Sequence, residues 1–502
     1  MNKKLVRLLC LLLTCAALLP AVVSCQKKKP SGNGDVIPSE ETTDEYSAYI
    51  SNLGVKNYDG REFVIAARNT STDSFFTLHP DDQGFMGYAV SDAMYTRDQR
   101  MMNDYGIEIA YKLYPDNDNG REIATTISNS ELLGAYAYDM VTSNITASIA
   151  TLQAQQALYN IEELPVIDSN MPWWSSYFWE GASYNNALYF TAGQAAGGGF
   201  FATPYVMMCN LELARDVYMQ NGSTMDMFGM VESGDWTLEN FEYIIQDYTT
   251  DLDSDGEISV YDDRLAYAHC RSEVTAQCHY VAAGMNFSTI DSEGKIVVNL
   301  SERVANMVER MASLFDSIKD NFNEAAYFQE SPSQQMVAFK NKRALFFGNS
   351  MSYVDEITDM VSDYAIIPCP KASSSQTEYY SGINLWTPGY IAFPMHCGDG
   401  DKEFVGYTAE LLGYWSYVYV KPVVYDKVLC LRLARDGRQI KIMDTIYSNL
   451  YVDLNYINDF AMSSSLITDC IMDVTKSFES QKQSIELVID LEIKKFIRDM
   501  SK

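Results

Sequence analysis

The chain has 502 residues, of which 47% are hydrophobic and 21% are charged. This composition is typical of a globular protein, and the length predicts two or more lobes, because one hydrophobic core rarely serves so many residues. There are 67 acidic residues against 37 basic ones, which gives a formal net charge of −30. So acidic a chain excludes nucleic acid as a partner and excludes electrostatic docking on anionic lipid.

The N-terminal segment has the layout of an export signal. Lys3, Lys4 and Arg7 precede an uncharged apolar run over residues 8–23, and the sequence VVSC then ends at Cys25. Basic, apolar and small-residue regions in this order are the parts of a signal peptide. The VVSC end resembles the lipobox of bacterial lipoproteins, whose cysteine is acylated and becomes the new N-terminus. We therefore predict a signal peptide over residues 1–24 and lipidation of Cys25; a plain secretory signal or an uncleaved anchor is the alternative.

A polar segment follows the predicted lipidation site. Residues 26–45 read QKKKPSGNGDVIPSEETTDE and contain few side chains that could be buried. Such a composition favours a flexible linker, which we place at residues 25–54. Two acyl chains hold a protein stably on a bilayer. The predicted location is therefore the extracytoplasmic face of the cell membrane, through a lipid anchor.

Strand and helix patterns alternate in the next part of the chain. Residues 63–67 form a short apolar run, residues 107–111 alternate as a strand does, and residues 139–141 are a third apolar stretch. Between and after them, residues 92–103 and 145–159 have helical spacing. This alternation predicts an α/β fold.

The later part of the chain shows three helix signals. Trp236 precedes a helix start that Thr237 would cap. Residues 301–315 and 477–498 each place apolar side chains along one helical face. Trp236 and Trp415 are assigned to structure rather than to binding.

Seven cysteines remain after the signal peptide and Cys25 are set aside. An odd number cannot be fully paired within one chain, and most of the seven have apolar neighbours. We predict buried free thiols, with Cys270 and Cys278 as the one local pair to test.

An acidic loop resembles the calcium loop of EF-hand proteins. Residues 251–262 read DLDSDGEISVYD, with Gly at the sixth position and carboxylates at the first, third, fifth and twelfth. Calcium prefers oxygen ligands on a loop that turns at such a glycine. The predicted structural Ca²⁺ site, remote from any binding cleft, has these ligands: Asp251, Asp253, Asp255, Glu257 and Asp262. A metal-free acidic turn is the alternative, and no cofactor is otherwise required.

Common catalytic motifs are absent from the sequence. None of GxSxG, HExxH, GxxxxGK[ST] and GxGxxG occurs, and the four histidines are scattered. Carboxylates are too numerous for any pair of them to indicate a glycosidase. We therefore expect a protein that is not an enzyme.

Several short motifs resemble, in order, those of the extracellular solute-binding proteins of carbohydrate ABC transporters, the maltose-binding-protein-like group. The likeness spans roughly residues 55–420. The stretches that carry it are DMV at 139–141, LPVIDSNMPWW at 164–174, ALYF at 187–190, YVMMCNLELARDVYM at 205–219, GDWTLENF at 234–241, KNKRALFFGNSMSY at 340–353 and DYAIIPCP at 363–370.

The resemblance implies a two-lobed, periplasmic-binding-protein-like α/β fold of type II. Its lobes would be joined by crossover hinge strands and would close on a ligand in the cleft between them. We expect residues 55–190 and 345–420 in lobe 1, and residues 191–344 and 421–502 in lobe 2.

Candidate ligand-binding residues follow from this expected cleft. In α/β sheets, ligands lie beyond the carboxyl ends of the strands. The short polar residues expected there are Arg68, Asn69, Thr142, Ser143, Asn144, Asn349 and Ser350. Flat aromatic rings suit the apolar faces of sugars, and the candidate stacking platforms are Trp173, Trp174, Trp386 and Tyr205.

The expected function is capture of a carbohydrate, an oligosaccharide for preference, and its delivery to an ABC permease. Its partners would be the sugar, the permease subunits and the membrane, without nucleic acid. A binding protein for peptide or another polar solute is the alternative within the same class. A surface glycoside hydrolase or an adhesion lipoprotein is the alternative from another class.

Overall fold

The computed structural model describes residues 46–115, 118–270, 272–319, 333–430 and 437–500. The predicted signal peptide, Cys25 and most of the linker lie outside these ranges. Contacts within the chain divide it into residues 1–52 and residues 53–502. Helix α2 (Ser47–Leu53) makes up nearly all of what is described of the first unit. Both sheets and the helices around them belong to the second unit.

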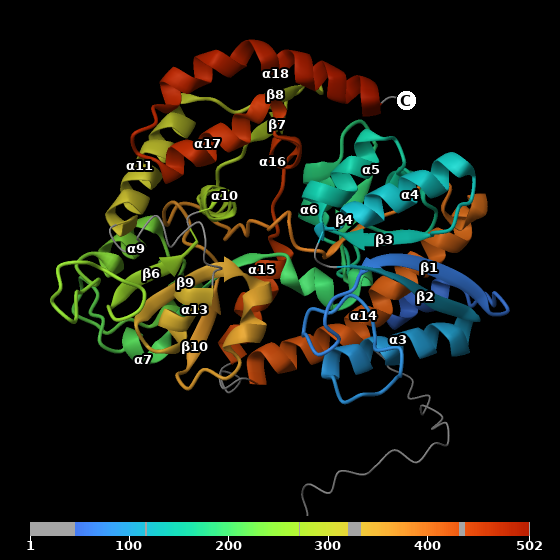
Figure 1. The fold of residues 1–502 in the computed structure, drawn as a ribbon, viewed down its shortest axis with the longest axis horizontal. Helices are drawn as coiled ribbons and strands as arrows, with labels where there is room; N and C mark the ends of the chain where they lie inside the picture. Colours follow the sequence, from blue (N-terminus) through green and yellow to red (C-terminus); the bar gives the residue numbers. More distant parts are fainter. Residues whose placement is uncertain (1–45, 116–117, 271, 320–332, 431–436, 501–502) are drawn as a thin grey trace, which may run out of the picture. The chain divides into compact units, whose positions relative to one another are not determined.

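The first sheet contains the three strands that the sequence predicts near the N-terminus. Its order is β2-β1-β3-β11-β4, with β1, β2 and β3 parallel and β11 antiparallel to both of its neighbours (Figure 1). The bounds are β1 Arg61–Arg68, β2 Ile107–Tyr114, β3 Met140–Ser143, β4 Phe190–Ala192 and β11 Tyr390–Ala392.

The second sheet has the order β10-β5-β9-β6. Strand β5 is antiparallel to β9 and β10, whereas β6 is parallel to β9. The bounds are β5 Tyr205–Asn210, β6 Leu265–His269, β9 Ala344–Ser350 and β10 Tyr364–Ile367. A separate hairpin joins β7 (Ser288–Ile290) to β8 (Ile296–Val298).

Helices cover both sheets and form a further group near the C-terminus. Those packed around the first sheet are α3 Ala89–Tyr105, α4 Arg121–Leu133, α5 Ala150–Ala154, α6 Ser176–Ala182 and α14 Lys402–Cys430. The second-sheet part of the chain contains α7 Leu211–Ala214, α8 Met227–Ser233, α9 Leu238–Ile245, α10 Glu273–Ala282, α11 Glu302–Lys319, α13 Ser333–Lys340 and α15 Gly437–Ser448. The last group is α16 Leu454–Asn458, α17 Ser463–Met472 and α18 Phe478–Met500. Among the described residues, no helix combines the length and the hydropathy that a membrane span needs.

The sequence signals for the long helices are confirmed. Helix α3 buries Ala93, Met94 and Met101 and ends at Gly106, whose φ of 61° lets its N–H reach carbonyls of the last turn. Thr237 caps α9 by accepting a hydrogen bond from the N–H of Asn240. Helix α11 buries the apolar face that the sequence predicts.

Two helix predictions differ from the structure in detail. The helix predicted over residues 145–159 is a π-helical turn, η2 (Ile145–Ile149), followed by α5, which ends at Ala154. A left-handed Gln156, with a φ of 56°, turns the chain soon after that end. On α18, Ile489 and Ile493 are buried as expected, but Val488 is 42% exposed.

The lobe boundaries expected from the sequence are wrong at one place. Residues 345–420 were expected in lobe 1, but β9 and β10 both pair with β5 in the second sheet. Strand β11 does pair in the first sheet, and α14 packs against α3. Residues 344–367 therefore belong with the second sheet, because distant pairing partners rather than local pattern decide where a strand lies.

The cysteines that the structure describes are free thiols, and most are buried, as predicted. They are Cys209, Cys270, Cys278, Cys369, Cys397 and Cys470. Cys270 and Cys278 do not form a disulfide. Burial raises the pKa of the Cys270 thiol to about 11, so this group stays protonated at neutral pH.

A buried carboxylate holds two adjacent tryptophans against α14. Glu410 is fully buried and accepts hydrogen bonds from Nε1 of Trp173 at 3.1 Å and from Nε1 of Trp174 at 2.8 Å. Buried indole N–H groups need an acceptor, and a carboxylate offers two oxygens. This contact fixes the segment before β4 to the helix that covers the first sheet.

We expect Glu410→Ala to lower the free energy of unfolding by roughly 2–5 kcal/mol, because it leaves two buried N–H groups without their acceptor at about 1–3 kcal/mol each. Urea denaturation measures the loss. Glu410→Gln keeps one acceptor oxygen, so its free energy of unfolding should fall by less. Glu403→Ala, at the exposed start of the same helix, is the matched control, and equal losses in Glu410→Ala and Glu403→Ala would contradict the assignment.

Candidate functional site

The carboxyl ends of β1 and β3 lie at the same edge of the first sheet. The two strands are parallel, with Ala67 opposite Thr142, so Arg68 and Ser143 come at neighbouring ends. Arg68, Thr142 and Ser143 are buried, while Asn69 is exposed. The predicted polar residues of this sheet are therefore brought together.

Asn144 holds the turn after β3. Its Oδ1 accepts from the N–H of Ala147 at 2.9 Å, and its Nδ2 donates to the carbonyl of Asn119 at 2.7 Å. The side chain is fully buried. Asn144 thus shapes the strand end, and its amide is already engaged by the protein.

Strand β9 contributes the polar end of the second sheet. Asn349 is 8% exposed, and its Oδ1 accepts from the N–H of Ser350 at 2.8 Å. Ser350 is fully buried, and its Oγ accepts from Nδ2 of Asn384 at 2.8 Å. Asn384 was not predicted from the sequence, although it lies only two residues before Trp386.

Residues 382–386, here named the crossing segment, connect the two strand ends. The carbonyl of Leu385 accepts from the N–H of Ile145 at 3.0 Å, at the end of β3. Asn384 reaches the other sheet through Ser350 and also donates its N–H to the carbonyl of Thr203 at 2.9 Å. The crossing segment therefore brings the predicted residues of both sheets to one place.

Trp386 is an exposed aromatic side chain on the crossing segment. It is 44% exposed, whereas most large rings of the described chain are buried. Its N–H donates to Oδ1 of Asn384 at 3.0 Å, which fixes the backbone on which the ring stands. An exposed ring held on an ordered backbone can serve as a flat stacking surface.

Three buried polar atoms at the strand ends have no hydrogen-bond partner within the described ranges. They are Oγ1 of Thr142, Oγ of Ser143 and Nδ2 of Asn349. A buried polar atom without a partner costs about 1–3 kcal/mol unless water or a ligand satisfies it. Each of these hydroxyl and amide groups can make one more hydrogen bond, to a water or to a ligand.

A second contact bridges the two sheets beside the crossing segment. Asp355 lies in η5 (Met351–Ile357), directly after β9, and its carboxylate accepts from Oγ of Ser74 and from the N–H of Phe75 at 3.2 Å. Ser74 belongs to the loop between β1 and α3. Burial raises the pKa of Asp355 to about 6, to which the nearby Asp73 and Glu356 add.

Three of the four predicted aromatic platforms are buried. Tyr205 is 2% exposed and its hydroxyl lies 3.2 Å from Oγ1 of Thr275, while Trp173 is fully enclosed against Glu410. The prediction that these two rings stack against a ligand is wrong in this structure, because both serve the core. Trp174 is 4% exposed and lines a separate cavity near the crossover.

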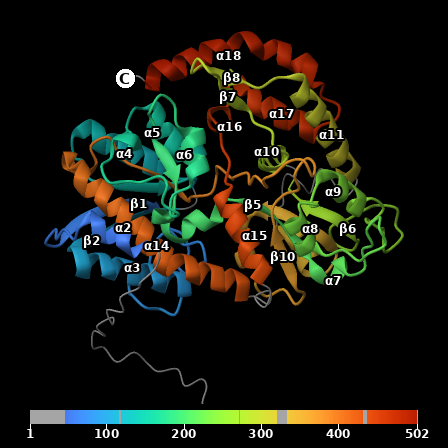
Figure 2. The same cartoon turned by 180° about the vertical axis from the view of Figure 1, so that it is seen from behind.

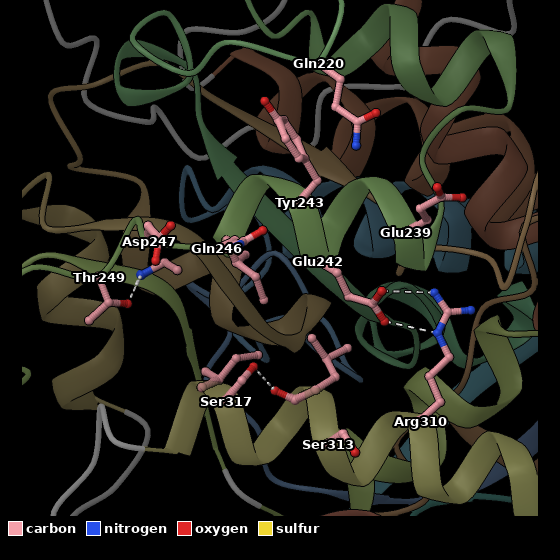
Figure 3. Close-up of a pocket in the computed structure, with 14 residues that line it drawn as sticks. Gln220, Glu239, Glu242, Tyr243, Gln246, Asp247, Thr249, Arg310, Ser313 and Ser317 are labelled. Carbon is pink, nitrogen blue, oxygen red and sulfur yellow. Dashed lines mark hydrogen bonds and ion pairs between the residues drawn. The ribbon is translucent and has the colours of Figure 1, made fainter.

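Another pocket lies elsewhere, between α9 and α11. It has a volume of about 850 Å³, and Glu242 and Arg310 form an ion pair across it with a nitrogen–oxygen distance of 3.0 Å (Figure 3). None of the predicted ligand-binding residues lines it. Among the described residues that line it, Tyr243 is the aromatic one.

The acidic loop gathers three carboxylates. Oxygens of Asp251, Asp253 and Asp263 lie within 4.8 Å of one another. Asp263 is buried and turned inward by the N–H groups of Leu252 and Ser259, whereas Asp262 is exposed. The structure thus places Asp263, and not the predicted Asp262, with the other two carboxylates; an oxygen-only set of this kind suits Ca²⁺.

Comparisons with known proteins agree on the fold. No protein-family model matches the chain, and no curated protein is similar in sequence. Many solved structures resemble it, including the following three. The maltose/maltodextrin-binding domain MalE from Bdellovibrio bacteriovorus bound to maltotriose has a TM-score of 0.50 and 13% identity, covering 86% of this chain and 100% of that one. The cyclic alpha-maltosyl-1,6-maltose binding protein from Arthrobacter globiformis has a TM-score of 0.54 and 10% identity, covering 86% and 99%.

The third is a cyclo/maltodextrin-binding protein complexed with maltotetraose, with a TM-score of 0.54 and 10% identity, covering 86% of this chain and 97% of that one. Coverage of almost the whole of each relative means that both lobes are matched. At these identities the likeness concerns the fold alone. The chain therefore has the two-lobed α/β fold of the maltodextrin-binding proteins, as its resemblance to solute-binding proteins predicts.

Proposed function

We propose that this chain is an extracytoplasmic binding protein that captures a carbohydrate, preferably an oligosaccharide, and delivers it to an ABC transporter permease. The observation that carries the proposal is the exposed ring of Trp386 on the crossing segment, which is hydrogen-bonded to the ends of β3 and β9. At those strand ends, Ser143 and Asn349 each have a buried polar atom without a partner in the described ranges. A sugar has apolar C–H faces and a rim of hydroxyl groups. An aromatic ring covers such a face, and the polar atoms bond the rim.

The fold supports the same proposal. The relatives named above bind maltotriose, a cyclic maltose derivative and maltotetraose. A type II fold captures its ligand when the lobes close about the crossing strands. The lipidated Cys25 would hold the protein on the outer face of the membrane, near its permease, and no catalytic step is part of the proposal.

The strand-end site is tested by substituting Trp386. In isothermal titration of residues 26–502 with a panel of malto-oligosaccharides and other glycans, we expect one class of sugar to bind. Trp386→Ala should weaken that binding roughly tenfold or more, since loss of about 1.4 kcal/mol corresponds to tenfold in Kd. Tyr218→Ala, which removes another exposed ring, is the control.

Other outcomes would contradict the proposal. Binding of peptides but of no sugar would point to the polar-solute alternative. Hydrolysis of a glycan by the pure protein would point to a hydrolase. Unchanged sugar affinity in Trp386→Ala would show that the ring of Trp386 does not contact the sugar.

The contact between Asp355 and the loop at Ser74 predicts a pH dependence. Burial raises the pKa of Asp355 to about 6, above the ordinary value for aspartate, although the hydrogen bonds from Ser74 and Phe75 act in the opposite direction. Protonation of this carboxyl therefore favours the folded state. This contribution is complete below about pH 4 and is lost as the pH rises through about 6. The melting temperature of the wild type, compared with that of Asp355→Asn, should therefore rise when the pH falls from 7 to 5.

Glu356→Gln is the matched control for this measurement, because it removes an exposed neighbouring carboxylate. The difference in melting temperature between Glu356→Gln and the wild type should stay nearly constant over the same pH range. A constant difference for Asp355→Asn as well would show that its carboxyl does not titrate with folding.

We further propose that the acidic loop binds a structural Ca²⁺ ion weakly, through Asp251, Asp253 and Asp263. Their clustered oxygens support a hard cation, and Asp255, Glu257 and Asp262 stay secondary candidates. Millimolar CaCl₂ should raise the melting temperature of the wild type, because an ion that binds only the folded state stabilises it. The double variant Asp251→Asn, Asp253→Asn should lose this increment.

Asp291→Asn is the control for the calcium measurement, since Asp291 caps the β7–β8 turn in a similar way but outside the acidic loop. Asp251 also holds its own turn by accepting from the N–H of Gly256. The readout is therefore the calcium-dependent increment and not the melting temperature alone. No increment in the wild type, or an equal one in the double variant, would refute the site.

A further inference from the structure

A separate cavity lies beside the crossover, away from the strand ends. Its volume is about 320 Å³, and its walls come from residues 169–176, from η4 (Gln194–Ala202) and from the helices α14 and α15. The two helices lie next to each other in the view from behind (Figure 2). None of the strand-end residues lines it. This volume is at the lower end of the range for small-molecule sites, about 300–1,000 Å³.

Aromatic rings form one part of the cavity wall, and polar side chains form another. Phe200 and Phe201 meet edge to face, with ring centroids 5.2 Å apart, and Tyr447 packs on both. Tyr425 stacks on Tyr447, with centroids 6.1 Å apart and an interplanar angle of 28°. Trp174 and Tyr417 are the other two aromatic side chains of the lining. These rings hold one another in place, so the apolar faces they present are ordered before any ligand enters.

One buried side chain in the wall has an unused hydrogen-bond acceptor. Gln194 is 3% exposed, and its Nε2 donates to the carbonyl of Pro172 at 3.2 Å. Its Oε1 has no hydrogen-bond partner in the described part of the chain. Because the Nε2 contact fixes which end of the amide is which, the free atom is an acceptor. It can accept a hydrogen bond from the O–H or N–H of a water or of a ligand.

The charged groups of the cavity are already paired. Lys421 lies 3.3 Å from Oδ1 of Asp444, and the hydroxyl of Tyr425 donates to the same oxygen at 3.0 Å. The ammonium of Lys421 also lies 5.0 Å from the ring centroid of Tyr425. Because these two charges neutralise each other, the cavity offers an ionic ligand no free charge of opposite sign. A neutral ligand with an apolar face and hydroxyl donors fits this lining.

We propose that this cavity is a second binding site, for a neutral polyhydroxylated molecule the size of one sugar ring. The occupant's C–H face packs on Phe200, Phe201 and Trp174, and one of its hydroxyls donates to Oε1 of Gln194. The site does not depend on the strand-end site, with which it shares no residue.

The two sites are distinguished by fluorine NMR of the full mature chain labelled with 5-fluorotryptophan. Trp174 reports on the cavity and Trp386 on the strand ends, and Trp174→Phe and Trp386→Phe assign the two signals. D-glucose and myo-inositol are the probes. We expect the Trp174 signal to shift saturably with at least one of them, and Gln194→Leu to weaken that response tenfold or more while the Trp386 signal behaves as in the wild type.

A second variant guards against misfolding of Gln194→Leu. Ser448 is exposed at the edge of the cavity, so Ser448→Phe should block entry and abolish the Trp174 response. Ser480→Phe, at an exposed position on α18, is the control and should leave the response intact.

Three results would overturn the second site. These are a Trp174 signal that neither probe moves, an undiminished response in Gln194→Leu, and an undiminished response in Ser448→Phe. If Trp386 responds to sugars while Trp174 does not, the second site fails and the proposed function stands. If Trp174 responds while Trp386 binds no glycan, the proposed function fails and the second site stands.

Discussion

The hydrogen bonds of the crossing segment hold the strand ends of the two sheets together. The segment is hydrogen-bonded to both sheets. The carbonyl of Leu385 accepts from the N–H of Ile145, just after β3, and Nδ2 of Asn384 donates to Oγ of Ser350, at the end of β9. The carbonyl of Gly382 in addition accepts from the N–H of Tyr205, at the start of β5. A backbone strip bonded to both sheets cannot shift without breaking buried bonds, so it fixes where the two polar strand ends meet.

Buried polar groups in this protein have two different roles. Asn144, Ser350 and Glu410 are buried with protein partners, and each holds one segment to another. Ser143, Asn349 and Gln194 are buried too, but each has one atom without a partner in the described ranges. The residues of the first group hold the backbone segments in place, and the residues of the second group stand on those segments. Because an unsatisfied polar atom is costly, the second group marks where water or a ligand completes the structure.

Local pattern was enough to predict the early strands, the long helices and the polar strand ends, because each of these depends on neighbours in the sequence. It was not enough for β9, which lies in the second sheet because its partners are β5 and β6, far away in the chain. Whether an aromatic ring is buried or exposed also depends on residues that are far away in the chain. Tyr205 is enclosed by Tyr267 and Thr275, whereas Trp386 stays exposed. The prediction of Asp262 as a calcium ligand failed for a related reason. Two N–H groups across the loop turn the carboxylate of Asp263 inward, so Asp263 lies with the other two carboxylates.

The charge of the chain and the chemistry of both sites favour the same class of ligand. A formal net charge of −30 disfavours the approach of anions. At the strand ends the unpartnered atoms belong to hydroxyl and amide groups, and in the cavity to an amide oxygen, so none of them carries a formal charge. In the cavity, Lys421 is neutralised by Asp444 before any ligand enters. Since specificity follows from groups that only the correct ligand can satisfy, a ligand with neutral hydroxyl groups would fit the unpartnered atoms of both proposed sites.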